Sequence, residues 1–350
     1  MTSVWDLPDF DHHEGVHAFT DRESGLRAII AVHSTHLGPA AGGARFWHYA
    51  SGDLAVTDAL RLSRGMSFKN AMAGLALGGG KGVILADKPG AIIPEAQLKA
   101  FGRAVESLGG RYVTAEDVGM SEARMKVIAG ETKYVSGLPV ESGAAGGDPG
   151  PYTAHGVYLG VKAAAKRGLG TDDMKGVHVA IQGVGSVGGG LARLLAKDGA
   201  RLTLADVDAA RAAALAAELG GETVAAGAIL GVEADIFSPN ALGAILTEAT
   251  IPTLTAKVVA GGANNQLATP EDGWRLHARG ITYAPDYVIN AGGIINVCLE
   301  YLGQGDRAEV EARIRKIPDR LDQVWDESAR TGEPASAVAD KIAQRLIGRG

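Results

Sequence analysis

Two lysines and an acidic pair stand beside glycine-rich segments in the first third of the sequence. Lys69 lies in GMSFKN, Lys81 directly follows three glycines in GGGKG, and Asp117 follows Glu116 in TAEDVG. Glycine lets the backbone turn tightly and approach a ligand closely. Two cations and an acid near such backbone suit a substrate that carries both a carboxylate and an ionisable amino group.

A second chemical signal is the hexapeptide GVGSVG, which has the pattern G-x-G-x-x-G. It follows a predicted strand (177–182) and opens a predicted helix, which is the context that a dinucleotide-binding turn requires. Asp206 ends the next predicted strand, at about the 20-residue separation expected for a carboxylate that binds a ribose hydroxyl. That carboxylate would repel a 2′-phosphate, and we expect Arg211 to face solvent, so the pattern favours NAD over NADP. The predicted cofactor-binding residues here are Gly183, Gly185, Ser186, Val187, Gly188 and Asp206.

The segments around these motifs predict a two-domain α/β protein. In the first part, apolar runs predict strands at 26–33 and 81–86, and a helix is predicted from Leu54 to about Leu75. After Lys175, strands and helices alternate, which is typical of a doubly wound parallel sheet. The segment 142–156 is rich in glycine and proline and predicts the approach to a domain boundary. We expect an N-terminal α/β substrate domain (1–145, joined by C-terminal helices at about 325–350) and a Rossmann NAD-binding domain (146–324).

Composition excludes several classes of protein. The 350 residues are 46% hydrophobic and 21% charged, with a formal net charge of -6 and no basic block, so we expect neither a nucleic-acid nor an anionic-membrane partner. The single cysteine precludes an intramolecular disulfide and favours a reducing compartment. No apolar run reaches the roughly 20 residues of a transmembrane helix, and no secretory signal is apparent, so we expect a cytoplasmic protein.

The spacing of the histidines and the cysteine does not indicate a metal site. His12, His13 and His17 are not accompanied by acidic or cysteine ligands at clear spacing. His33 and His36 flank a strand end and are expected on the surface. Cys298 has no histidine beside it in sequence and is expected to be a small buried hydrophobe.

Several long segments resemble the glutamate/leucine/phenylalanine/valine dehydrogenase family, and within it the leucine-type enzymes. The resemblance implies a substrate domain, a Rossmann domain, a cleft between them and a homo-oligomer. It also implies NAD-dependent oxidative deamination of an L-amino acid to a 2-oxo acid and ammonia. The segments are GPAAGGARFW, LRLSRGMSFKNAMAGLALGGGKGVI, YVTAEDVG, IQGVGSVG, DIFSPNALG, VVAGGANNQL and YAPDYVINAGGIINV.

The resemblance also implies roles for individual residues. Lys81 matches the catalytic lysine, and Asp117 matches the carboxylate that exchanges protons with the substrate nitrogen. Lys69 matches the lysine that binds the substrate carboxylate, helped by the backbone of Gly42 and Gly43. The positions that match residues around the cofactor, some also near the substrate, are Thr153, Ala241, Asn264 and Asn290.

Lys81 must be neutral for part of its time if it is to act as a base. A free lysine has a pKa of about 10.4 and is mostly protonated near neutral pH. We expect burial and a second cation, Lys69, to lower the pKa of Lys81 toward the working range.

The predicted pocket for the substrate side chain is apolar. Glutamate enzymes of the family place a lysine where this chain has Ala41, and we see no other cation at the pocket positions Ala115, Ile294 and Val297. A buried, unpaired carboxylate is costly, so glutamate should be rejected. Ile294 and Val297 favour leucine, isoleucine or valine, whereas the small Ala41 leaves phenylalanine as an alternative. A dehydrogenase of 2-hydroxy acids and a catalytically silent NAD-binding sensor are further alternatives.

Overall fold

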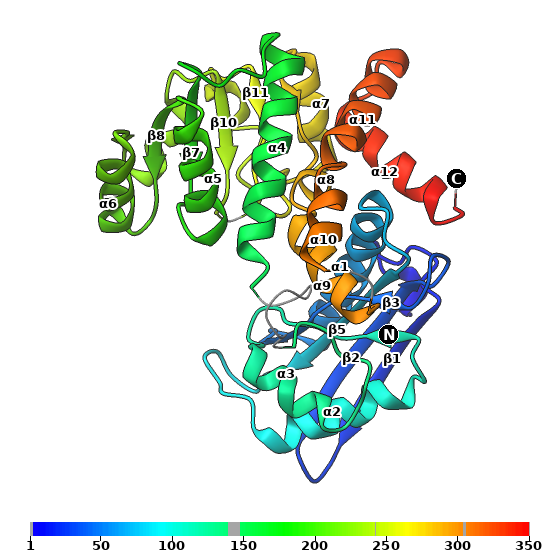
Figure 1. Cartoon of the computed structure of the whole chain (residues 1–350). Helices are drawn as coiled ribbons and strands as arrows, with labels where there is room; N and C mark the ends of the chain where they lie inside the picture. The colour runs from blue at the N-terminus through cyan, green and yellow to red at the C-terminus, as the bar shows by residue number, and fades with distance from the viewer. Residues whose placement is uncertain (1–2, 139–147, 242, 304–305, 350) are drawn as a thin grey trace. The chain divides into compact units, whose positions relative to one another are not determined.

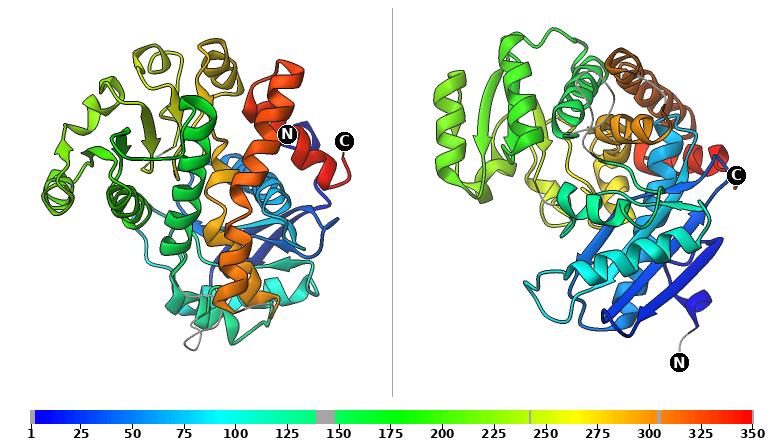
Figure 2. Two further views of the ribbon diagram at one scale, coloured as in Figure 1. Left: turned by 45° about the horizontal axis from the view of Figure 1, so that its top comes forward. Right: turned by 60° about the horizontal axis from the view of Figure 1, so that its bottom comes forward.

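The computed structural model describes residues 3–138, 148–241, 243–303 and 306–349 of the chain. The chain divides into two compact units. The first comprises Met1–Gly147, Val297–Arg307 and Ala343–Gly350, and the second comprises Asp148–Asn296 and Ala308–Ile342. Figures 1 and 2 follow the chain from blue to red through these segments. No described helix has both the length and the apolar character needed to cross a bilayer.

The first unit is built on a mixed sheet with the order β1-β2-β5-β3-β6, in which β4 also pairs with β5. Strands β1, β2 and β5 are antiparallel neighbours, whereas β3 and β4 run parallel to β5, and β6 runs parallel to β3. The elements are β1 (Gly15–Asp21), β2 (Leu26–Ser34), β3 (Ala40–Ala41), β4 (Ala44–Trp47), β5 (Gly78–Leu85), β6 (Tyr112–Val113), α1 (Gly52–Met72), α2 (Glu95–Ser107) and α3 (Glu122–Ala129), after a short 3-10 helix (Val4–Asp6).

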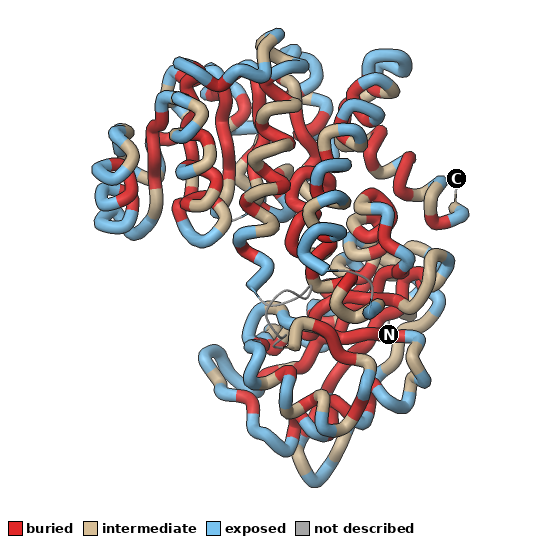
Figure 3. The backbone as a smooth tube through the Cα atoms, in the orientation of Figure 1, coloured by how far each residue is buried: buried red, intermediate tan, exposed pale blue. Residues whose placement is uncertain are grey.

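Strand β2 shows why the sheet is covered on both faces. Successive side chains of a strand point to opposite faces, and nearly all of β2 is buried, as Figure 3 shows in red. Ile30 belongs to the apolar cluster that contains Phe101 of α2, whereas Ala31 belongs to the cluster that contains Ala59 of α1. The two helices therefore bury the two faces of one apolar strand.

Strand β5 begins three residues earlier than predicted, at Gly78 rather than Lys81. A Cβ atom on Gly79 would lie 2.0 Å from the backbone nitrogen of Ser67 in α1, and one on Gly80 would lie 2.6 Å from the ring of Tyr112. The glycines are thus part of the strand, at positions where its neighbours leave no room for a side chain.

The second unit has a six-stranded sheet with the order β12-β11-β10-β7-β8-β9, and every pair in it is parallel. The order reverses between β7 and β10, which is the doubly wound arrangement of a Rossmann domain and confirms the predicted fold class. The strands are β7 (His178–Gln182), β8 (Arg201–Ala205), β9 (Glu222–Thr223), β10 (Ile236–Pro239), β11 (Val258–Val259) and β12 (Thr282–Tyr283). The helices that follow residue 148 are α4 (Gly150–Leu169), α5 (Ser186–Lys197), α6 (Ala209–Leu219), α7 (Pro270–Ala278), α8 (Asp286–Ile289), α9 (Gly292–Tyr301), α10 (Arg307–Ile314), α11 (Ile317–Thr331) and α12 (Ala335–Leu346), with 3-10 helices at Ala226–Gly231 and Ile251–Thr253.

Residues 325–350 were expected to join the first domain, but the structure divides the C-terminal part of the chain between the two units. Residues 308–342 belong to the second unit, where the Trp325 indole N–H donates to the Tyr283 carbonyl of β12 at 2.8 Å. Only Ala343–Gly350 and Val297–Arg307 join the first unit. Arg349 anchors the chain end there by donating to the backbone carbonyls of Asp11, His12 and His33.

Candidate active site

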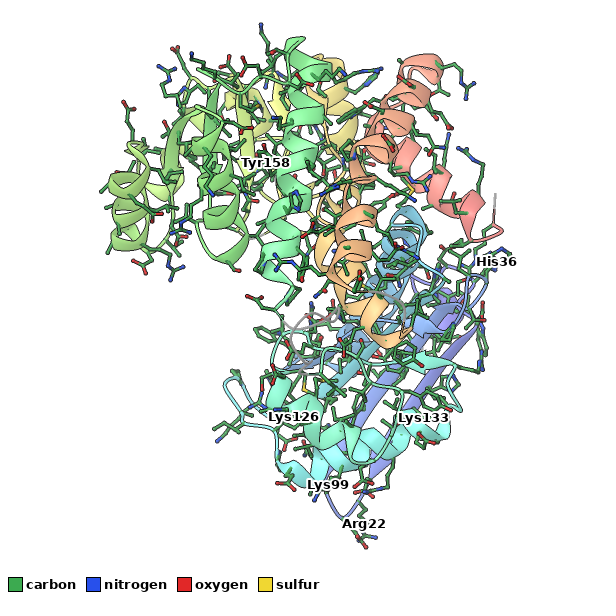
Figure 4. All side chains as sticks on the ribbon, in the orientation of Figure 1. Arg22, His36, Lys99, Lys126, Lys133 and Tyr158 are labelled. Carbon is green, nitrogen blue, oxygen red and sulfur yellow. The ribbon has the colours of Figure 1, made fainter. Side chains whose placement is uncertain are left out.

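Lys81 and Asp117 form a buried pair in the first unit. Lys81 lies on β5 with 5% of its surface exposed, and its Nζ donates to the Oδ2 atom of Asp117. Asp117 lies in the loop after β6, where its Oδ1 atom accepts a hydrogen bond from the Val118 N–H at 2.7 Å. Lys99 of α2 and Lys126 of α3 differ from the buried Lys81, because their side chains extend outward from the fold (Figure 4).

The surroundings lower the pKa of both members of the pair, Lys81 and Asp117. Burial lowers the pKa of Lys81 below its usual value, and although Asp117 acts in the opposite direction, Arg45 lowers it further. For Asp117 burial alone would raise the pKa, but Lys81 and Arg45 outweigh it and the pKa is lowered. A lysine that releases its proton readily beside an ionised carboxylate can exchange protons with a bound substrate or water.

Gly42 and Gly43 form a turn between β3 and β4. Both of these strands pair with β5, the strand that carries Lys81. Strand β3 pairs with Gly78 and Gly79, and pairing resumes in β4 opposite Gly82. A Cβ atom on Gly42 would lie 1.9 Å from the Gly80 carbonyl oxygen, and one on Gly43 would lie 2.9 Å from the Cβ of Asp117. The turn therefore brings bare backbone against the Lys81–Asp117 pair. Two pocket candidates adjoin it, since Ala41 pairs with Gly79 and Val113, and the Ala115 carbonyl accepts the N–H of Ala44.

Lys69 lies half-buried on α1. The next residue, Asn70, donates from its amide to the Gly78 carbonyl at 2.6 Å and ties this turn of the helix to β5. Lys69 also acts on the Cys298 thiol: burial raises the pKa of Cys298 to about 12, and Lys69 lowers it in part. Cys298 is buried, as predicted. The effect of Lys69 on Lys81 stays a prediction.

The remaining pocket candidates lie on α9. Both Ile294 and Val297 are half-buried. Val297 belongs to the first unit, with the lysines and Asp117, whereas Ile294 belongs to the second unit.

The second unit gathers the predicted cofactor residues at the carboxyl ends of its strands. Gly183 has a φ of +83°, in the left-handed region that favours glycine, and a Cβ atom on it would lie 2.7 Å from the Cβ of Ala241. A Cβ atom on Gly188 would lie 1.9 Å from the Gly183 carbonyl oxygen, whereas one on Gly185 would meet nothing within 4 Å. Gly185 is the N-cap of α5 and its cap has no side-chain hydrogen bond. The turn is therefore closed on its inner side and open at the helix N-terminus, which suits a pyrophosphate.

Asp206 lies at the end of β8 and bonds to this turn. Its carboxylate accepts the Val184 N–H at 2.8 Å and the Asp208 N–H at 2.9 Å. Burial alone would raise the pKa of Asp206, but these hydrogen bonds outweigh it and the pKa is lowered. Arg211 is 53% exposed, as expected, and lies 3.8 Å from Asp206 and 3.2 Å from Asp208. The site therefore presents a fixed negative charge beside the turn.

Asn264 and Asn290 are also among the predicted cofactor residues. Asn290 donates from its amide to the Asn264 Oδ1 at 2.7 Å and to the Gly262 carbonyl at 3.2 Å. Its own Oδ1 atom is buried and has no hydrogen-bond partner among the described residues, so a polar acceptor is left for a ligand. A Cβ atom on Gly262 would lie 2.8 Å from Val187 of the glycine turn, which links the asparagines to it.

Thr153 and the loop after β10 lie in the same unit. The Thr153 hydroxyl donates to the Pro149 carbonyl at 2.9 Å, in the first turn of α4. At the start of that helix, a Cβ atom on Gly150 would lie 2.1 Å from the Oγ of Ser186. In the β10 loop Ala241 is exposed, and Leu242 lies outside the described residues.

Arg45, in the segment GPAAGGARFW, has no role predicted from the sequence. The structure places its Nε atom 3.5 Å from Asp117 and its Nη1 atom 2.9 Å from Asp58. The only signal in the sequence was its position directly after the glycine turn. The expectation that His33 lies on the surface was wrong: it is fully buried, because the N-terminal segment and Arg349 cover it.

Comparison with known proteins identifies the family of the chain. Residues 13–134 match the family model described as "Glu/Leu/Phe/Val dehydrogenase, dimerisation domain", and residues 203–346 match "Glutamate/Leucine/Phenylalanine/Valine dehydrogenase". The chain is 50% identical over 327 residues to a leucine dehydrogenase of Geobacillus stearothermophilus, covering 93% of this chain and 88% of that protein. It is 48% identical over 341 residues to a valine dehydrogenase of Streptomyces coelicolor, covering 96% and 92%.

A solved structure shows the same fold. The L-tryptophan dehydrogenase of Nostoc punctiforme superposes with a TM-score of 0.86 at 38% identity, covering 96% of each chain. Sequence motifs, sheet topology and these similarities lead to one conclusion: the chain belongs to the Glu/Leu/Phe/Val dehydrogenase family of amino-acid dehydrogenases.

Proposed function

We propose that the protein catalyses the reversible, NAD-dependent oxidative deamination of branched-chain L-amino acids to their 2-oxo acids and ammonia. The observation that carries the proposal is the buried Lys81–Asp117 pair beside the Gly42–Gly43 turn. The relatives that act on leucine and valine, at 46–50% identity over nearly the whole chain, support the substrate class.

The catalytic roles follow from the charges of the pair. In its neutral form Lys81 takes a proton from the water that attacks the imino carbon of the oxidised substrate. Asp117 takes a proton from the substrate amino group and returns it to the nitrogen that leaves as ammonia. Lys69, on the helix that Asn70 ties to β5, binds the substrate carboxylate together with the backbone of Gly42 and Gly43.

The second unit supplies the cofactor site. The open N-terminus of α5 at Gly185 and Ser186 would hold the pyrophosphate, and Asp206 would accept hydrogen bonds from the adenosine ribose. When bound, the nicotinamide accepts the hydride that leaves the substrate α-carbon. Since the Asp206 carboxylate is charged and held by two backbone N–H groups, it disfavours a 2′-phosphate, and we infer NAD rather than NADP.

The pocket candidates contain no charged side chain. Ala41 is buried, and Ala115, Ile294 and Val297 are half-buried. A substrate γ-carboxylate would find no cation among these four residues and would lose its hydration without compensation. The proposal therefore includes rejection of glutamate and, because Ile294 and Val297 occupy part of the space, weaker activity on phenylalanine.

Assembly and location are part of the proposal. The match of residues 13–134 to a dimerisation domain supports a homo-oligomer. The single, buried cysteine supports a reducing, cytoplasmic environment.

The test is an assay of the purified protein with NAD and a panel of L-amino acids, followed by the absorbance of NADH. Leucine, isoleucine and valine should be oxidised, with little activity on phenylalanine or glutamate. Replacing NAD by NADP should reduce the rate, and the reverse reaction should require ammonia. Absence of activity on every amino acid would refute the proposal, and a preference for phenylalanine would refute the pocket assignment alone.

A further inference from the structure

We propose that Arg45 is a positioning residue that keeps the Asp117 carboxylate charged and in place whether or not Lys81 holds its proton. The inference rests on the proposed function, because it concerns the same pair.

The geometry places Asp117 between two cations. Its Oδ2 atom accepts the hydrogen bond from Lys81 and also lies 3.5 Å from the Nε atom of Arg45. That Nε is buried and has no hydrogen-bond partner among the described residues. An N–H so close to a carboxylate oxygen can complete a hydrogen bond through a small movement of Asp117.

Hydrogen bonds in which Asp58 is the acceptor fix the position of Arg45. Its Nη1 donates to the Asp58 Oδ2 on α1 at 2.9 Å, and the Tyr49 hydroxyl donates to the same oxygen at 2.6 Å. Asp58 is 9% exposed. Although burial acts to lower the pKa of Arg45, Asp117 and Asp58 outweigh it and the pKa is raised. The guanidinium is therefore a permanent charge in a fixed position.

The chemistry requires such a charge. When Lys81 loses its proton, an isolated Lys81–Asp117 pair would leave a largely buried carboxylate without a counterion, which is costly. The proton would then tend to stay on the pair. Arg45 does not titrate in the working range, so it compensates Asp117 in both states and makes the release of the Lys81 proton easier.

Other titratable groups also face this pair. Asp117 contributes to the raised pKa of the buried Tyr112 on β6, although burial is the larger cause, and Asp58 acts on Lys81 from α1. The titratable groups of this cluster are the pair itself, Lys81 and Asp117, and their neighbours Arg45, Asp58, Tyr49 and Tyr112.

The experiment compares the full-length protein with Arg45→Gln, Arg45→Lys and the matched control Arg61→Gln. Arg61 also lies near Asp58, at 3.4 Å, but its side chain is 59% exposed. Two quantities are measured: the pH dependence of kcat/KM for leucine oxidation, and the titration of Lys81 by NMR of protein carrying ¹³C at the lysine ε-carbon. The Lys81 signal is assigned with Lys81→Met.

For Arg45→Gln we expect the acidic limb of kcat/KM and the Lys81 titration to move to higher pH by about one pH unit, with a loss of up to about tenfold at a pH on the limb. Arg45→Lys should restore the limb in part, and Arg61→Gln should leave both readouts unchanged. An unmoved Lys81 titration in folded Arg45→Gln, or an equal shift in Arg61→Gln, would overturn the inference. If Arg45→Gln does not fold, Arg45→Lys decides: a lower kcat with a limb moved by less than one pH unit supports positioning, and wild-type kcat with an unmoved limb refutes it. Inactive wild-type protein would refute the proposed function, while the NMR titration would still test Arg45.

Discussion

The Nζ atom of Lys81 on β5 donates a hydrogen bond to the Oδ2 atom of Asp117, a residue 36 positions later in the chain. Both side chains are largely removed from solvent, with 7% and 19% of their surface exposed. A lysine and an aspartate held together in this way influence each other's proton affinity, and the predictions for Lys81 and Asp117 follow from that pairing.

Replacing Lys81 by methionine should nearly abolish turnover. The substitution keeps the length of the side chain but removes the base, so kcat should fall by about 100- to 10,000-fold. Binding of NADH, measured by its fluorescence, should stay near the wild-type value because the predicted cofactor residues lie in the other unit. The exposed Lys99→Met is the matched control and should retain activity. Turnover near normal in Lys81→Met would contradict the assigned role.

Replacing Asp117 by asparagine should also lower kcat, and it should move the pH dependence in the direction opposite to Arg45→Gln. Asp117 raises the pKa of Lys81, so removing its charge should lower that pKa further. The acidic limb of the residual kcat/KM should therefore appear at lower pH than in the wild type. Rate measurements at high enzyme concentration across the pH range test this. A limb that moves to higher pH would mean that Asp117 does not act on Lys81 as a charge.

Replacing Asp206 by asparagine should weaken the discrimination against NADP. The amide keeps the size of the side chain but removes the charge that would repel a 2′-phosphate, so the ratio of kcat/KM for NAD to that for NADP should fall by about tenfold or more. Asp208→Asn is the control, because asparagine can still cap α6 and Asp208 is more exposed. An unchanged ratio in Asp206→Asn would show that another residue selects the cofactor.

His33 should make the fold less stable in mild acid. Burial lowers the pKa of His33 to about 3, and Arg349 and His13 add to the effect, whereas an unfolded histidine titrates near 6.5. Below about pH 6.5 the unfolded chain therefore binds a proton that the folded chain does not, and the free energy of unfolding falls. Between about pH 6.5 and 5 this group should cost about 2 kcal/mol.

Urea unfolding of the wild type, His33→Gln and the control His36→Gln tests this expectation. His36 is exposed, and Figure 4 labels it. His33→Gln should lose less stability than the other two proteins as the pH falls across this window, whatever its stability at neutral pH. Equal slopes for all three proteins would show that His33 takes up its proton in the folded state as readily as in the unfolded chain.

Two glycine-to-alanine changes should have opposite effects on stability. In Gly79→Ala the new Cβ would lie 2.0 Å from the backbone nitrogen of Ser67, so α1 and β5 would have to separate, and the protein should lose several kcal/mol or fail to fold. In Gly65→Ala, on the same helix, the Cβ would meet nothing within 4 Å, and the higher helix propensity of alanine should stabilise by about 0.5–1 kcal/mol. Thermal unfolding distinguishes the two. A stable Gly79→Ala would contradict the close packing of α1 on β5.

Local patterns in the sequence predicted the class of fold and the family correctly, and they also indicated most of the candidate site residues. The alternation of strands and helices after Lys175 is a local pattern, and it correctly predicted the parallel sheet of the second unit. Contiguous motifs include the GVGSVG turn and the segment around Lys69 and Lys81. Their residues can be identified from the sequence without knowledge of their neighbours in space. The similarity to leucine and valine dehydrogenases confirms the family assignment.

Which side chains act on one another depends on contacts between segments that are far apart in the sequence. Arg45 precedes Asp117 by many residues and meets it because β4 bonds to the segment around Asp117, where the Ala115 and Val118 carbonyls accept backbone N–H groups of β4. No local pattern encodes this long-range contact. The burial of His33 has the same cause, since Arg349 reaches it from the end of the chain. The beginning of β5 at Gly78 and the placement of residues 308–342 in the second unit also depend on such contacts. Hydrophobic periodicity reports that a face is buried, but the partner that buries it is selected by the packing of the whole chain.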